Sequence, residues 1–307
     1  MKFAEHPLLI FDGACGTNLQ LVEISDAQWS GCDGCNEILN VSAPQHIVAL
    51  HQSMLDAGAM VLETDTFGAS RIVLAEYGLQ DRVREINTRA VENAREAIAG
   101  RPDRYIAGSV GPGTKLPSLG HIPVEDLRQA TTEQIAALLD AGVDCLMIET
   151  CQDLLQTKTA LVAAFDMLEA AGLDLPVLVS VTIEQQGTML VGTDIAAVVA
   201  TIEPFPVFSL GLNCATGPQD MRSHVQYLSR HWPRRISVIP NQGMPEVVAG
   251  KTHYPLSPAD YAEQMWRFVT QQGVSIVGGC CGTSPEHIAA LATRLAGVVP
   301  AAREVLS

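Results

Sequence analysis

The chain of 307 residues carries a formal net charge of −15 at pH 7, and 47% of its residues are hydrophobic while only 5% are aromatic. This acidity argues against a nucleic-acid partner, which needs a basic surface. Because no run approaches the roughly 18 apolar residues of a membrane span, a membrane protein is not expected either. The length suits one large α/β barrel or two smaller domains.

The first sixteen residues hold too short an apolar run for a signal peptide. We therefore expect a cytoplasmic protein whose eight cysteines stay reduced. Under these conditions metal binding or catalysis explains the cysteines better than a disulfide framework does.

Strand-like and helix-like segments alternate along the whole chain. Eight apolar runs are predicted to form strands, at 8–14, 59–67, 105–111, 145–150, 176–182, 207–214, 236–243 and 274–281. Amphipathic helices are predicted between them, among others at 44–57, 81–99, 132–141 and 153–171. This alternation predicts an α/β fold, a single-domain (β/α)8 TIM barrel over 1–299. Residues 300–307 are expected to be a frayed tail or the start of a linker.

Polar residues gather where the predicted strands end. Asp12 ends the first strand, residues 63–65 end the second, Glu149 the fourth and Asn213 the sixth. In a barrel these ends meet on the face that carries active sites. Carboxylates beside cysteines suggest a positively charged ligand, such as the ammonium group of an amino acid. Ordinary loop carboxylates are the alternative, although buried carboxylates are rare without a partner.

Three cysteines also lie at strand ends. Cys280 and Cys281 follow the apolar run 274–277 and two glycines, just before a predicted helix that Ser284 caps. The glycines allow the backbone to bend so that adjacent sulfurs converge on one metal ion. Cys214, at the end of the sixth strand, is the candidate third ligand. Because 66 residues separate it from Cys280, the spacing alone leaves buried inert thiols as an alternative.

The other cysteines are given structural roles. Cys32 and Cys35 form a C-x-x-C pattern, which occurs in redox and metal sites. No strand-to-helix setting surrounds them, so we favour a reduced surface loop. Cys15, Cys145 and Cys151 are expected to be packing residues. The eight histidines show no metal-ligand spacing, and no role is assigned to them.

Several segments together resemble the homocysteine S-methyltransferase family, and within it the homocysteine-binding modules of cobalamin-dependent methionine synthases. They are FDGACGTNLQ (11–20), GCNEILN (34–40), DAGAMVLETDTFGAS (56–70), AGSVGPGTK (107–115), MIETCQDLLQTKTAL (147–161), GLNC (211–214), PNQGMP (240–245) and GGCCGTS (278–284). They run from one end of the chain to the other, and the pairing of GLNC with GGCC is highly specific.

The resemblance implies a (β/α)8 barrel that holds Zn²⁺ on the thiolates of Cys214, Cys280 and Cys281. It also implies L-homocysteine as methyl acceptor, with its sulfur as the fourth ligand. Few free thiols are ionised at neutral pH, and coordination to zinc removes the proton. Three thiolates leave the open position that a catalytic zinc needs. Such sulfur-rich ligation suits S-methylation better than water activation.

The same resemblance implies where the rest of the substrate binds. Asp12 and Glu149 would face its amino group, and the backbone amides around Gly13 and Ala14 would take its carboxylate. Asn213 would orient the neighbouring zinc ligand.

The methyl donor implied is methylcobalamin, carried by a corrinoid-binding domain or protein. This chain has no D-x-H-x-x-G corrinoid motif, so it would supply the homocysteine half of the reaction, as a fragment or a separate subunit. Other donors stay open, namely S-methylmethionine, S-adenosylmethionine and betaine, as does another thiol or selenol as acceptor. Further alternatives are a zinc-binding scaffold without activity and a cysteine-nucleophile enzyme using Cys281, although no paired histidine is visible.

Overall fold

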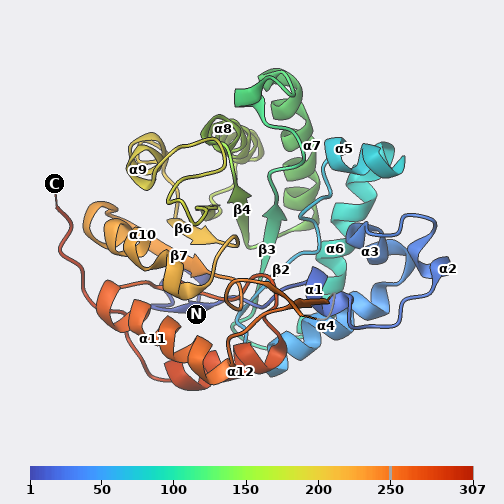
Figure 1. Ribbon diagram of the computed structural model, residues 1–307. Coiled ribbons are helices and arrows are strands. Elements are labelled where there is room, and N and C mark those ends of the chain that lie inside the picture. Colours follow the sequence, from blue (N-terminus) through green and yellow to red (C-terminus); the bar gives the residue numbers. More distant parts are fainter. Residues whose placement is uncertain (249–250, 307) are drawn as a thin grey trace.

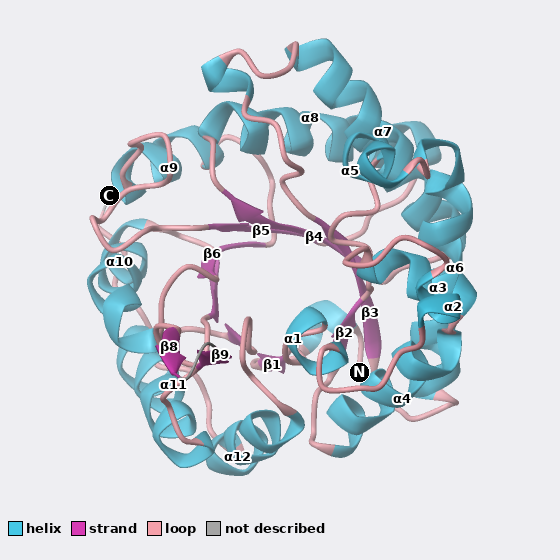
Figure 2. Cartoon of the chain, turned by 45° about the vertical axis from the view of Figure 1, so that its right-hand side comes forward, coloured by secondary structure: helices cyan, strands magenta, loops and turns pink. Residues whose placement is uncertain are grey.

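The computed structural model describes residues 1–248 and 251–306. Within them, eight parallel strands form a central barrel (Figures 1 and 2). The strands are β1 (Leu9–Ile10), β2 (Val61–Glu63), β3 (Tyr105–Val110), β4 (Cys145–Cys151), β5 (Val177–Val181), β6 (Ser209–Asn213), β7 (Arg235–Ile239) and β10 (Ile276–Val277). Their order in the sheet is β1-β10-β7-β6-β5-β4-β3-β2, and a parallel bridge between Phe11 and Val61 joins the two ends. The predicted (β/α)8 barrel is confirmed.

Helices surround the strands on the outside (Figure 2). The longer ones are α4 (Pro44–Asp56), α6 (Val83–Ile98), α7 (Val124–Ala141), α8 (Leu154–Ala171), α9 (Ile195–Ile202), α10 (Pro218–His231), α11 (Pro258–Gln272) and α12 (Pro285–Leu295). Short helices are α1 (Gly16–Leu19), α2 (Asp26–Trp29), α3 (Leu39–Ser42) and α5 (Arg71–Leu74), with 3-10 turns at 3–5, 36–38, 75–77, 80–82 and 117–119. An antiparallel hairpin, β8 (Glu246–Val248) and β9 (Lys251–His253), follows β7. Among the described residues, no helix is long and apolar enough to cross a bilayer.

Two kinds of boundary differ from the prediction. Helix α7 begins at Val124, eight residues before the predicted start at 132, because Glu125 and Asp126 suit a helix N-terminus and Leu127 extends the buried face. All the barrel strands except β4 are shorter than the predicted runs. The segment after β2, for example, leaves the ladder for a turn in which the Thr66 amide bonds to the carbonyl of Thr64. These irregular ends place polar side chains above the barrel.

The barrel interior is filled by apolar side chains below the strand ends. One buried cluster there includes Leu9, Phe11, Met147, Leu178 and Ile276. A larger cluster packs the outer sheet face against the helices. The closed interior leaves the C-terminal ends of the strands as the place where a ligand can enter.

Strands β6 and β7 approach each other closely at Gly211. A Cβ atom at this position would lie 2.0 Å from Ser237 Oγ and 2.1 Å from the Ser237 carbonyl oxygen. Only a glycine fits this contact, which sets the position of β6 three residues before Cys214.

The C-terminal segment 300–306 hydrogen-bonds to the barrel, while its role as a tail or the start of a linker stays a prediction. The Ala301 amide donates to the carbonyl of Val269 at 3.0 Å. The Arg303 guanidinium donates to the carbonyl of Trp232 at 2.7 Å. These contacts tie the segment to α11 and to the end of α10. The division at residue 299 stays a prediction.

Candidate active site

Three thiols meet above the barrel. Cys214 follows β6, and Cys280 and Cys281 follow β10; their Sγ atoms all lie within 4.8 Å of one another. The Sγ atoms of Cys214 and Cys281 are 3.9 Å apart. All three thiols are free and partly buried. Cysteines that are far apart in the sequence therefore form the predicted cluster.

The local backbone explains how the sulfurs converge. Cys214 adopts a left-handed conformation, with φ +58°, which turns the chain sharply at the end of β6. Gly279 packs so closely that a Cβ atom there would lie 2.3 Å from Thr283 Oγ1. The Cys280 amide donates to the carbonyl of Pro240 at 2.8 Å, which fixes this loop against the end of β7.

The cluster fits a tetrahedral zinc ion. With Zn–S bonds of about 2.3 Å, tetrahedral geometry places sulfur ligands about 3.8 Å apart, close to the 3.9 Å between Cys214 and Cys281. The neighbouring thiols of Cys214 and Cys280 lower the pKa of Cys281 to about 3. Hydrogen bonds with Cys214 and Cys281, together with burial, raise the pKa of Cys280 well above its ordinary value. The soft thiolate character suits zinc better than magnesium or calcium.

Two buried carboxylates stand beside the thiols. Both oxygens of Asp12 lie 3.2 Å from the Glu63 amide, which donates to them. Glu149 accepts hydrogen bonds from Ser109 Oγ at 2.5 Å and Asn213 Nδ2 at 3.3 Å. Burial raises the pKa of Glu149 to about 7 and that of Asp12 well above its usual range. A cationic group in this pocket would favour the ionised form of both.

Asn213 joins the carboxylates to the thiol cluster. Besides its contact with Glu149, its Nδ2 donates to Thr150 Oγ1 at 2.7 Å, and its Oδ1 accepts from the Thr150 amide at 2.9 Å. It is buried, and it precedes Cys214 in the chain. Its three contacts hold the end of β6 against the end of β4.

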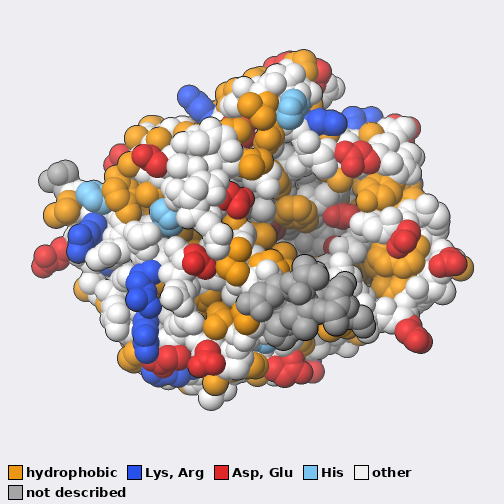
Figure 3. Space-filling model, in the orientation of Figure 1, with side chains coloured by type: hydrophobic (Ala, Val, Ile, Leu, Met, Phe, Trp, Pro, Cys, Tyr) orange, Lys and Arg blue, Asp and Glu red, His pale blue; other side chains and the backbone are white. Residues whose placement is uncertain are grey.

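These groups line one cavity of about 340 Å³ at the barrel mouth. Of the residues predicted to form the site, seven line it: Asp12, Gly13, Ala14, Glu149, Cys214, Cys280 and Cys281. Asn213 lies behind the wall. The mouth is a hollow in the face shown in Figure 3, with acidic and hydrophobic side chains along it. The Ala14 amide donates to Thr283 Oγ1 at 3.1 Å, so a substrate carboxylate would compete with this hydroxyl.

Sequence reasoning missed several residues at the cavity. Cys15 packs against the core under the short helices, as expected, but it also lines the cavity and donates to Asp65 Oδ1 at 3.4 Å. Glu63 also lines it and was noted only as a strand end. His51 of α4 lies behind Asp12, with 4.0 Å between Nδ1 and Oδ2. The helical spacing of His51 from Ile47, a buried neighbour, was the signal that could have shown its burial.

The C-x-x-C pair lies in a loop whose residues 31, 33 and 34 are exposed, as predicted, although the two cysteine side chains themselves are buried. Cys32 and Cys35 are buried, Cys35 with 1% of its surface exposed, and both are free. They pack with Leu19, Ile38 and Leu74 in a separate core under the short helices. The sequence showed the glycines of this segment but not the helices that cover it. Cys145 and Cys151 are buried, as expected.

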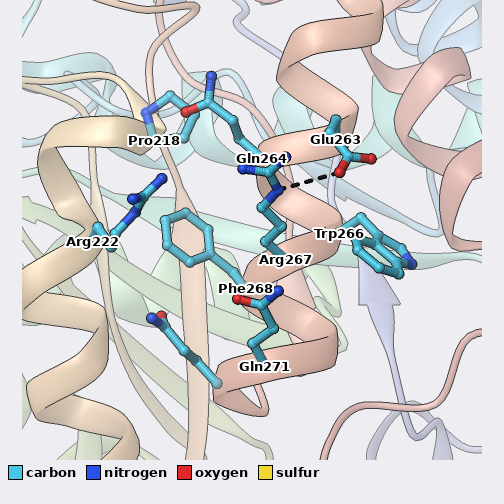
Figure 4. A pocket seen from close by; sticks show the side chains of 9 residues that line it. Pro218, Arg222, Glu263, Gln264, Trp266, Arg267, Phe268 and Gln271 are labelled. Carbon is cyan, nitrogen blue, oxygen red and sulfur yellow. Dashed lines mark hydrogen bonds and ion pairs between the residues drawn. The ribbon is translucent and has the colours of Figure 1, made fainter.

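A second groove lies between α10 and α11 (Figure 4). Arg222, Trp266 and Phe268 are among the side chains on its walls. Its Arg267 forms an ion pair at 3.2 Å with Glu263 one turn away on the same helix. An ion pair between neighbouring side chains of an outer helix is typical of a solvated surface groove. We therefore place the active site at the barrel mouth.

The fold and the cavity define a barrel protein that positions three thiols and two buried carboxylates at the ends of its strands, as an enzyme site does. The model of the homocysteine S-methyltransferase family matches residues 9–295, so the chain belongs to this family of enzymes. The resemblance seen in the sequence is confirmed.

Curated relatives include methionine synthases from two mycobacteria. The chain is 42% identical over 302 residues to the one from Mycobacterium tuberculosis, covering 97% of this chain and 25% of the relative. It is 43% identical over 301 residues to the one from Mycobacterium leprae, covering 95% of this chain and 25% of that relative. The chain thus spans about a quarter of the length of these proteins.

Among solved structures, the chain is similar to the homocysteine methyltransferase MmuM from Escherichia coli. The metallated form matches with a TM-score of 0.74 and 27% identity, covering 94% of this chain and 97% of that one. The apo form matches over the same shares with a TM-score of 0.68.

Proposed function

We propose that this barrel activates L-homocysteine for methylation of its sulfur, which gives methionine. The observation that carries the proposal is the cavity itself, in which a three-thiol cluster lies beside two buried carboxylates. A thiol at one end of the substrate and an ammonium at the other match these two sets of groups. The family to which the chain belongs supports the choice of homocysteine.

Cys214, Cys280 and Cys281 would hold Zn²⁺, as their spacing allows. The ion, when bound, supplies the Lewis acidity that keeps a thiol ionised at neutral pH. The cysteine sulfurs would keep the site rich in electrons, and a set of only three would leave room for a sulfur of the substrate. The substrate sulfur would then attack the methyl carbon, forming a C–S bond while the donor leaves with the electrons of its bond to carbon.

The carboxylates fix the other end of the substrate. Asp12 and Glu149 would accept hydrogen bonds from its ammonium, and the amides around Gly13 and Ala14 would face its carboxylate. Asn213 positions Glu149 through the 3.3 Å contact and holds the residue before Cys214. Holding both ends of the substrate orients its sulfur toward the mouth of the barrel, where the donor must arrive.

The donor we propose is methylcobalamin, carried by a separate domain or protein that meets the barrel mouth. Support comes from the two methionine synthases, a quarter of whose length this chain matches. A smaller donor, such as S-methylmethionine, is the second candidate. It is favoured by the match to 97% of a homocysteine methyltransferase of similar extent.

Zinc X-ray absorption, with and without L-homocysteine, tests the acceptor and the metal together. We expect a change from three sulfur neighbours and one lighter atom to four sulfur neighbours. Zinc that does not respond to homocysteine would contradict the proposal and favour a structural metal or another thiol. A panel of methylcobalamin, S-methylmethionine, S-adenosylmethionine and betaine, with methionine measured against metal-free protein, then identifies the donor.

A further inference from the structure

His51 is a buried polar residue that the proposed chemistry does not yet use. It lies on the inner face of α4 among Ile47, Val48, Met54 and Leu55, with 2% of its surface exposed. Its Nε2 is buried and has no hydrogen-bond partner among the described residues. Its Nδ1 faces the carboxylate of Asp12, 4.0 Å from Oδ2.

The environment of the His51 ring is electrostatically unfavourable for a residue that only packs. A buried nitrogen without a partner costs free energy that an apolar side chain would not. Burial lowers the pKa of His51 to about 4, so the ring is neutral at pH 7 and carries one N–H. A proton on Nδ1 would point at a carboxylate oxygen, whereas a lone pair there would repel an ionised carboxylate.

Asp12 is held less firmly than its partner carboxylate. Glu149 accepts from three side chains, those of Ser109, Asn213 and Thr150. Both oxygens of Asp12, in contrast, share the single amide of Glu63 at 3.2 Å. Because its two oxygens share one donor, a second donor at Oδ2 would hold the Asp12 carboxylate more firmly.

We infer that His51 is a positioning residue, which donates from Nδ1 to Asp12 Oδ2 and so aims this carboxylate at the substrate ammonium. The inference rests on the proposed function. At 4.0 Å the contact is too long for a hydrogen bond, and an approach of about 1 Å closes it. Such contacts commonly tighten only when the substrate is bound. The ring then gains a partner at the moment when Asp12 must carry its charge.

Two variants of similar size separate this role from packing. The amide of His51→Asn places an N–H donor near the position of Nδ1, whereas that of His51→Gln places it near Nε2. Binding to the zinc-loaded protein is measured by calorimetry with L-homocysteine and with 4-mercaptobutanoate, which has the same thiol and carboxylate but no ammonium. Circular dichroism and zinc content check that each variant is folded and loaded.

We expect His51→Gln to weaken homocysteine binding about tenfold or more, the loss typical of a hydrogen bond to a charged group. His51→Asn should stay within about threefold of the parent, and 4-mercaptobutanoate should bind equally to all three proteins. Equal losses for both variants, or for both ligands, would show that His51 only packs.

A double-variant cycle tests whether His51 acts through Asp12. In an Asp12→Asn background, His51→Gln should cause little further loss, because the carboxylate that it positions is gone. Additive losses would overturn the inference. This cycle also carries the test if His51→Asn does not fold. A parent protein that binds neither thiol would overturn the proposed function, and the inference with it.

Discussion

Replacing Gly211 with alanine should damage both the barrel and the thiol site. The added Cβ would lie 2.1 Å from the backbone oxygen of Ser237, about 0.9 Å inside the 3.0 Å below which Cβ contacts are essentially never found. A backbone atom cannot swing away, so β6 and β7 must separate. Overpacking of this kind costs about 1–3 kcal/mol, and a backbone clash belongs at the upper end. With an unfolding entropy of about 2.1 cal/mol/K per residue, about 3 kcal/mol lowers the melting temperature of this 307-residue chain by roughly 5 °C.

The assay is chemical and thermal unfolding of Gly211→Ala beside a control, Gly108→Ala. At Gly108 of β3 a Cβ would meet only side-chain atoms, the nearest being Leu138 Cδ1 at 3.2 Å. The control should therefore lose about 1 kcal/mol or less. Adding Ser237→Ala to Gly211→Ala should not restore stability, because the backbone oxygen remains. If Gly211→Ala is as stable as the control, the reasoning about this contact is wrong.

Three further predictions concern the site. Cys280→Ala should lose zinc and methyl transfer while circular dichroism stays that of the barrel; full zinc content by metal analysis would exclude the three-thiol site. Glu149→Gln should keep zinc but weaken homocysteine binding about 30-fold or more, since loss of a buried charge partner costs roughly 2 kcal/mol at least. An unchanged affinity by calorimetry would show that Glu149 does not bind the ammonium group. Burial and the charge of Glu37 raise the pKa of Asp65 to about 8. The folded state therefore holds this proton where the unfolded state has lost it, so stability should fall between about pH 4 and 8. Asp65→Asn should flatten that fall in urea titrations, and an unchanged slope would count against the shift.

The periodic segments of the sequence were enough to predict the barrel and where its site lies. Alternation of apolar runs with amphipathic helices is a local property of the sequence, and all eight predicted strands are present in the structure. The ends of those strands must meet in a barrel, so Asp12 and Glu149 could be placed on one face before any distance was known. The three cysteines could be grouped with confidence only through the family resemblance, because their spacing in the chain carries no geometry.

What sequence could not show depends on packing between distant elements. The burial of Cys35 comes from short helices that cover it, and those helices have weak periodic signals. The position of His51 behind Asp12 depends on how α4 lies against the end of β1. The contacts of the tail depend on Arg303. Its charge is typical of a solvated chain end, but its guanidinium donates to backbone carbonyls.

The two shortest strands of the barrel lie side by side, and the site depends on both. β1 and β10 have two residues each, and they lead to Asp12 and to the adjacent cysteines. A seam with so few ladder bonds opens at lower free energy than the longer strands opposite, and it should exchange its amide hydrogens first. Local opening of this seam would loosen Asp12 and the adjacent cysteines together. Under the proposed function, this seam is where the pocket opens to release product while the other strands of the barrel stay paired.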